Sequence, residues 1–222
     1  MPGATVLEGA LEGFSRTRFT ARGKTRDIYR TGAGPAVIVM SEIPGITPLV
    51  ASFARRVAAI GCTAVLPQLF GIPGGRAHTE AHGADCCRRV HLAGALAMMV
   101  EEVVLAPVLS QPALPFPLTR TRRRDLGIGD EDLARVRERC GAGDVCVLGL
   151  RFTGDKAVPP ERFARLREEL GDAFVAVEID SRPGNPEGYR KVLTEDLRDV
   201  GNSATRASLE QVLDLFRSKL LS

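Results

Sequence analysis

The chain has 222 residues, of which 44% are hydrophobic and 26% are charged, a balance typical of a globular protein with a substantial apolar core. Its 30 Lys and Arg residues exceed its 27 Asp and Glu residues by three, too few for a general nucleic-acid-binding surface. With 23 Gly and 14 Pro the chain should form many turns, and its composition excludes collagen-like, low-complexity and coiled-coil proteins.

Apolar or alternating runs predict strands, in order, at residues 14–21, 25–30, 36–40, 63–67, 103–109, 145–150 and 173–179. Apolar residues at helical spacing predict helices at 48–60 and 209–220. A polar helix is expected around 130–139, and a helix with proline at its first turn at 159–170. The first helix has an expected N-cap at Thr47, proline at its first turn and a stop at Gly61. This alternation indicates one α/β domain over residues 1–222, with a doubly wound, mostly parallel sheet after an N-terminal antiparallel hairpin.

The expected location is the cytoplasm, because the first residues, MPGATVLEGALEG, lack the basic and apolar regions of a secretory signal. Glu101, Glu102 and Pro107 interrupt the longest apolar stretch, so we expect no membrane span. Reduced thiols are expected for the five cysteines, an odd set without a CxxC motif: Cys62, Cys86, Cys87, Cys140 and Cys146.

Three blocks of sequence are distinctive: SEIPGITPLVASFARRVAAIGCTAVLPQLFGIPG, then VLAPVLSQPALPFPL, then LRFTGDKAVPPERF. In content and order they resemble the dienelactone hydrolase family of α/β-hydrolases, over about residues 14–220. The resemblance implies an α/β-hydrolase fold that hydrolyses a small-molecule lactone or other carboxylic ester without a metal or organic cofactor. It also implies a Cys nucleophile on a strand-to-helix elbow, a later Asp, a His further on, and a Glu near the first strand-to-helix turn.

Two of these positions match. Glu42, in Ser-Glu-Ile-Pro-Gly, matches the active-site glutamate of the family, and the backbone N–H of Ile43 lies where the oxyanion hole would draw a donor. Asp155, in Thr-Gly-Asp-Lys-Ala-Val-Pro, matches the triad aspartate. Apart from the resemblance, Asp is also a favoured turn residue.

The nucleophile and the histidine do not match. Where the family has a G-x-C-x-G-G elbow, this chain has Arg-Arg-Val-His-Leu-Ala-Gly, so His91 stands at the position of the cysteine. No His follows His91, and Arg190 is the nearest match to the family's histidine. A guanidinium cannot act as a base at neutral pH. The resemblance therefore implies an impaired or inactive hydrolase.

The segment 72–90 is the least compatible with the fold. A central parallel strand should be nearly continuously apolar, whereas Cys-Cys-Arg-Arg-Val-His-Leu places two arginines in its middle. We expect residues 72–90 to be irregular or short-helical, leaving the sheet one strand poorer or with a weak strand near Val90. A shortened gene or a pair of compensating frameshifts is a hypothesis that fits this change.

Other interpretations stay open. Cys86 or Cys87 is an alternative nucleophile, with His82 or His91 as its base. His78, His82 and Cys86 have a spacing that could bind zinc on a helix, although glycines interrupt any such helix.

The basic run at residues 120–124 is either a site for phosphate or an acidic substrate or a solvated segment. A different class of function also fits the whole chain: a non-catalytic module that binds a small molecule or another protein.

Overall fold

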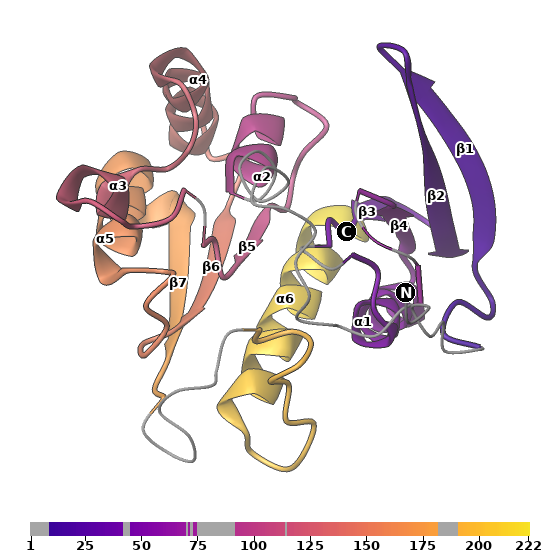
Figure 1. Ribbon diagram of the computed structural model, residues 1–222. Coiled ribbons are helices and arrows are strands. Elements are labelled where there is room, and N and C mark those ends of the chain that lie inside the picture. Colours follow the sequence, from indigo (N-terminus) through magenta and orange to yellow (C-terminus); the bar gives the residue numbers. More distant parts are fainter. Residues whose placement is uncertain are drawn as a thin grey trace, which may run out of the picture. The chain divides into compact units, whose positions relative to one another are not determined.

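The computed structural model describes residues 9–41, 45–69, 71, 73–74, 92–113, 115–181 and 191–222 (Figure 1). The chain divides into two compact units, one of Met1–Cys87 with Leu220–Ser222 and one of Arg88–Lys219. The single domain expected over residues 1–222 stays a prediction. The segment 72–90, apart from Pro73 and Gly74, lies outside the described residues, as does the weak strand expected near Val90.

The first unit contains a four-stranded sheet in the order β1-β2-β4-β3. Its strands are β1 (Ser15–Ala21), β2 (Lys24–Gly32), β3 (Ala36–Ile38) and β4 (Thr63–Pro67). Strands β1 and β2 form the expected antiparallel hairpin, and β3 pairs with β4 in parallel. Arg22 and Gly23, at the hairpin turn, both have positive φ, the geometry that suits the right-handed twist of two-residue hairpins.

Helix α1 (Pro48–Ala59) connects β3 to β4, and its ends follow from local sequence signals. The hydroxyl of Thr47 accepts a hydrogen bond from the backbone N–H of Val50 at 3.2 Å, so the predicted N-cap is confirmed. The buried face of the helix includes Phe53 and Val57 and packs against β2 and β4. The strand, helix, strand unit predicted here is therefore present.

The second unit contains three parallel strands in the order β5-β6-β7, namely β5 (Val108–Ser110), β6 (Val147–Phe152) and β7 (Phe174–Ile179). Its helices are α2 (Leu92–Met98), α3 (Arg120–Arg124), α4 (Asp130–Gly141), α5 (Pro160–Leu170) and α6 (Ala204–Leu220). Helices α3 and α4 pack on α5, and a 3₁₀ turn at Gly171–Ala173 leads into β7 (Figure 1). No helix in the described ranges combines the length and apolarity needed to cross a bilayer.

The strand expected at 103–109 is shorter than predicted. Only Val108–Ser110 pairs with β6, and Val103 is 87% exposed. The guanidinium of Arg139, on α4, donates to the carbonyl oxygens of Glu101, Glu102 and Val104 at 2.7–3.1 Å. Because a side chain satisfies these backbone groups, they need no strand partner, and this part of the prediction was wrong.

Strand β6 lies in the core of the second unit, and all six of its residues are buried. The rings of Phe163 and Phe174 pack edge to face beside it, with centroids 5.5 Å apart. A Cβ at Gly149 would lie 2.6 Å from the ring of Phe174, so this strand position requires glycine.

Arg162, on α5, holds the proline-rich segment that follows β5. Its guanidinium is fully buried and donates to the carbonyl oxygens of Pro112 at 2.6 Å, Arg122 at 3.1 Å and Asp125 at 3.0 Å, and also to that of Pro115. Burial lowers the pKa of Arg162 to about 10, although nearby Asp125 opposes the shift. The side chain stays charged at neutral pH, so its donors compensate for the lack of regular backbone pairing in the segment.

We expect Arg162→Leu to lower the free energy of unfolding by about 3 kcal/mol, because several buried carbonyl oxygens lose their donor. Urea unfolding followed by circular dichroism measures this change. Arg135→Leu, at an exposed position of α4, is the control and should change stability by less than about 0.5 kcal/mol. Equal losses in the two variants would contradict the anchoring role.

Candidate functional site

The carboxyl ends of β5, β6 and β7 form one edge of the second sheet, because the three strands are parallel. Open α/β sheets bind their ligands outside this edge. Three polar residues lie within three positions of these strand ends: Gln111 after β5, Asp155 after β6 and Ser181 after β7. This edge is the candidate site.

Asp155 is built into a tight turn after β6 and is 8% exposed. Its carboxylate Oδ1 accepts a hydrogen bond from the backbone N–H of Ala157 at 2.8 Å. Its own N–H donates to the carbonyl oxygen of Phe152 at 3.2 Å, and its carbonyl oxygen accepts from the N–H of Val158 at 3.3 Å. The turn therefore fixes the carboxyl group relative to the strand.

Two reciprocal hydrogen bonds join the Asp155 turn to the end of β7. The N–H of Gly154 donates to the hydroxyl of Ser181 at 2.9 Å, and the N–H of Ser181 donates to the hydroxyl of Thr153 at 3.2 Å. Thr153 also donates its N–H to the carbonyl oxygen of Ile179 at 2.8 Å. Asp155 is thus held beside the point where the chain leaves β7.

An ion pair with one buried partner lies just before this turn, at the end of β6. Arg151, opposite Glu178 in the register of β6 and β7, is 4% exposed and donates to Glu178 at 2.7 Å and to the carbonyl oxygen of Val158 at 2.7 Å. Burial by itself would raise the pKa of Glu178, but hydrogen bonds from Arg167 and Arg151 outweigh it and hold that pKa below its usual value. This pair was not predicted from the sequence, where its one signal is an arginine inside an apolar strand.

No family model and no curated protein matches the sequence. Solved structures do match: a candidate dienelactone hydrolase from Klebsiella pneumoniae has a TM-score of 0.56 at 18% identity, with 91% of this chain and 97% of that chain covered. The fold is that of the α/β-hydrolases. A dienelactone hydrolase from Anabaena variabilis has a TM-score of 0.57 at 13% identity, covering 94% of this chain and 100% of its own.

A thermostable esterase with the same fold has a TM-score of 0.57 at 11% identity, with 95% of this chain and 64% of that chain covered. The structural similarity shows the α/β-hydrolase fold. At sequence identities this low it shows the fold alone, so any activity has to be argued from the residues of the site. The predicted fold class, a mostly parallel α/β-hydrolase sheet with an N-terminal hairpin, is confirmed.

Of the predicted catalytic residues of this α/β-hydrolase fold, the structure places Asp155. The others lie outside the described residues: Glu42, Ile43, Cys86, Cys87, His91 and Arg190. The positions suggested for zinc, His78, His82 and Cys86, also lie outside them. Within the described ranges no three His, Cys, Asp or Glu side chains form a possible metal site, which leaves the zinc hypothesis untested.

Two of the described cysteines, Cys62 and Cys140, are poorly suited to nucleophilic chemistry. Burial raises the pKa of the Cys62 thiol and also that of the Cys140 thiol, and a raised pKa reduces the thiolate that such chemistry requires.

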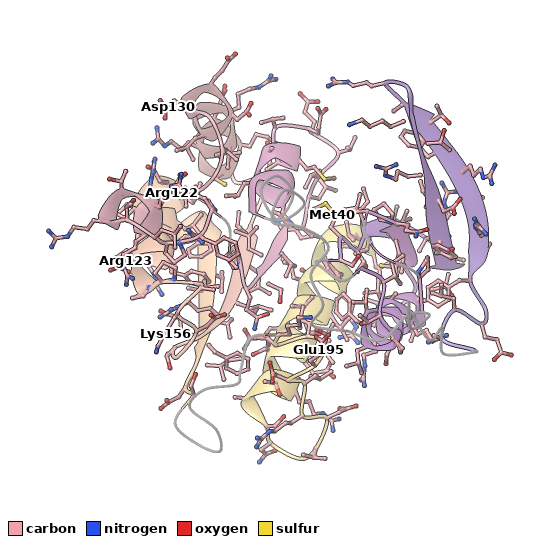
Figure 2. All side chains as sticks on the ribbon, viewed as in Figure 1. Met40, Arg122, Arg123, Asp130, Lys156 and Glu195 are labelled. Atoms are coloured by element: carbon pink, nitrogen blue, oxygen red, sulfur yellow. The ribbon has the colours of Figure 1, made fainter. Side chains whose placement is uncertain are left out.

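Part of the basic run at residues 120–124 is used to dock α3 on α5. Arg123 donates two hydrogen bonds to Glu161, at 2.8 and 2.9 Å, and Arg124 pairs with Glu168. Arg122 is exposed (Figure 2). The charges of Arg123 and Arg124 are paired with glutamates of α5. These two residues therefore form neither the anion site nor the solvated segment predicted for this run.

We expect Asp155→Ala to destabilise the protein by about 1 kcal/mol, because the N–H of Ala157 loses its acceptor. Asp155→Asn keeps a carbonyl oxygen at that position and should cost less. Thermal unfolding of both variants beside Asp172→Ala, an exposed control, measures the difference. An equal loss in the Asn and Ala variants would show that the charge, rather than the turn bond, dominates.

Glu178 should stabilise the protein in a pH-dependent way. Its folded-state pKa is lowered, so its contribution is fully present above the unfolded value of about 4.3 and is lost as the pH falls through the folded value. We expect Glu178→Gln to lose about 1 kcal/mol at pH 7 and to approach wild type near pH 2. Urea unfolding across this range, with the exposed Glu138→Gln as control, tests it; a loss independent of pH would contradict the prediction.

Proposed function

We propose that this chain is an α/β-hydrolase-fold protein with a site for a small carboxylic ester or lactone, and that its hydrolytic activity is impaired or absent. The observation that carries the proposal is the Asp155 turn. A triad aspartate acts by orienting a histidine, and here the aspartate is fixed beside the end of β7, after which the chain contains no His.

The other roles follow from the resemblance. Glu42 would lie near the reacting carbonyl, and the N–H of Ile43 would donate to the oxyanion. His91 occupies the nucleophile position, where a thiol or hydroxyl would be expected. Covalent catalysis needs a nucleophile and a base within hydrogen-bond reach, and the guanidinium of Arg190 cannot supply that base.

A relocated nucleophile would change this conclusion. Cys86 or Cys87 could attack an ester if His82 or His91 accepted the thiol proton, and Arg88 and Arg89 would favour the thiolate. A non-catalytic binding protein is the second candidate function. It is favoured by the buried side-chain nitrogen of Gln111, which lies at the same sheet edge as Asp155 and lacks a hydrogen-bond partner among the described residues.

Hydrolysis of p-nitrophenyl acetate and of dihydrocoumarin, with enzyme-free samples as background, tests the proposal. We expect kcat/KM below about 10² M⁻¹ s⁻¹, against about 10⁴ to 10⁸ M⁻¹ s⁻¹ for typical enzymes. Asp155→Asn should change any residual rate by less than about twofold, as should the control Asp172→Asn, because the chain has no His after Asp155 at the position that a triad would use.

Two results would overturn the proposal of impaired hydrolysis. A kcat/KM in the typical range that falls at least about 10²-fold in Asp155→Asn would indicate a working triad. Activity that disappears in Cys86→Ala or Cys87→Ala, and survives in the Cys146→Ala control, would indicate a relocated thiol nucleophile.

A further inference from the structure

Gln111 has an unusual backbone conformation at the candidate site. It directly follows β5, and its N–H donates to the carbonyl oxygen of Leu150, on β6, at 2.9 Å. Its φ of 49° lies in the left-handed region, which costs a residue with a Cβ about 1 to 2 kcal/mol. Non-glycine residues in this region cluster at functional sites, so the strain directs attention to what the side chain does.

The side chain of Gln111 is fixed in orientation. It is 9% exposed, and its Oε1 accepts a hydrogen bond from the backbone N–H of Val192 at 3.0 Å. The hydroxyl of Ser110 lies 3.2 Å from the same oxygen. A backbone N–H can only donate, so the atom facing Val192 must be the oxygen, and the amide nitrogen points the other way.

The segment around Val192, which donates to the Gln111 side chain, is itself fixed by hydrogen bonds and an ion pair. Beside Val192, the N–H of Lys191 donates to the carboxylate of Asp196 at 2.8 Å, and the ammonium of Lys191 pairs with Glu195 at 2.9 Å. Burial alone would raise the pKa of Glu195, but hydrogen bonds from Thr194 and Lys191 outweigh it and lower that pKa. Glu195 is therefore ionised at neutral pH. The anchor for Gln111 is preorganised before any ligand binds.

The amide nitrogen of Gln111 is a buried donor without an acceptor. It is shielded from solvent and makes no hydrogen bond within the part of the chain that the structure describes. Such a group costs about 1 to 3 kcal/mol, a penalty that disappears when an acceptor reaches it. Because an amide nitrogen only donates, its partner must be an acceptor, which excludes ammonium groups and metal ions.

We propose that the amide nitrogen of Gln111 binds an acyl oxygen of the ligand, the carbonyl of a small carboxylic ester or the carboxylate of the corresponding acid. The ligand would occupy the sheet edge between Gln111 and the Asp155 turn and displace the side chains that shield the nitrogen. The choice of an ester or its acid rests on the proposed function. The donor role of Gln111 rests on its own geometry.

The test is a titration of the full chain, labelled with nitrogen-15, with butyrate and separately with ethyl butyrate, followed in proton–nitrogen spectra. Side-chain amide signals come from three Gln and two Asn residues, so the Gln111 pair is identified by its loss in Gln111→Glu. We expect a saturable shift of the Gln111 amide pair with at least one probe. No saturable shift with either probe, or a cross-peak to water alone, would overturn the proposal.

Gln111→Glu keeps an oxygen for the N–H of Val192 but removes the donor, and it should weaken binding of the probe at least about tenfold, which corresponds to about 1.4 kcal/mol. Gln211→Glu makes the same chemical change at an exposed position of α6 and should bind within about twofold of wild type. Equal binding by the two variants would overturn the proposal. If Gln111→Glu does not fold, the side-chain amide signals of Gln111 are assigned in the wild-type protein by sequential spectra. The wild-type titration then tests the proposal by itself.

Hydrolysis measured in the same samples separates this inference from the proposed function. Rapid conversion of ethyl butyrate together with a shift at Gln111 would refute the impaired hydrolase and support the Gln111 donor. Stable ethyl butyrate together with no shift at Gln111 for either probe would leave the impaired hydrolase standing and refute the donor.

Discussion

The second unit depends on a strand that has no solvent-facing side. Every residue of β6 is buried, and the ring of Phe174, on β7, leaves no room for a Cβ at Gly149. A charged residue on such a strand requires a partner, which Glu178 provides for Arg151 from the adjacent strand. The polar residues with a possible chemical role stand where β6 and its neighbours end, because only there can the chain leave the core.

Guanidinium groups organise the segments between the regular elements of this unit. Arg162 binds the carbonyl oxygens of a proline-rich stretch, and Arg139 does the same for the stretch before β5. Both segments lack a backbone ladder, so their carbonyl groups take donors from elsewhere. A buried arginine can satisfy several at once because its donors are fixed in a planar fork.

Two polar side chains at the sheet edge differ in their hydrogen bonding: the Asp155 carboxylate accepts a hydrogen bond, whereas the Gln111 nitrogen makes none among the described residues. Asp155 is oriented by its turn and joined to β7, as a scaffold for acyl chemistry would require. The side-chain oxygen of Gln111 accepts a hydrogen bond from Val192, and its nitrogen is a donor without a partner in the described part of the chain. Stability alone does not explain a strained backbone and an orphaned donor in one residue, whereas a ligand oxygen would compensate for the unpaired donor.

Local sequence was sufficient for much of this architecture. Continuous apolar runs predicted the strands at 63–67 and 145–150 closely, and the Thr-Pro signal predicted the start of α1. These features depend on neighbouring residues, whose periodicity and capping chemistry can be recognised without a fold. The resemblance also brought attention to Asp155, although the sequence could not distinguish a triad member from a turn residue.

Tertiary structure decided the features that depend on distant partners. The shortened β5 follows from a side chain on α4, and the use of Arg123 follows from a glutamate on α5. Val192, 81 positions along the chain, fixes the orientation of the Gln111 side chain by donating to its oxygen, and this leaves the amide nitrogen unpaired among the described residues. Sequence determines which groups can donate or accept, but folding decides which of them meet, because a hydrogen bond requires a few ångströms in space and is indifferent to separation along the chain.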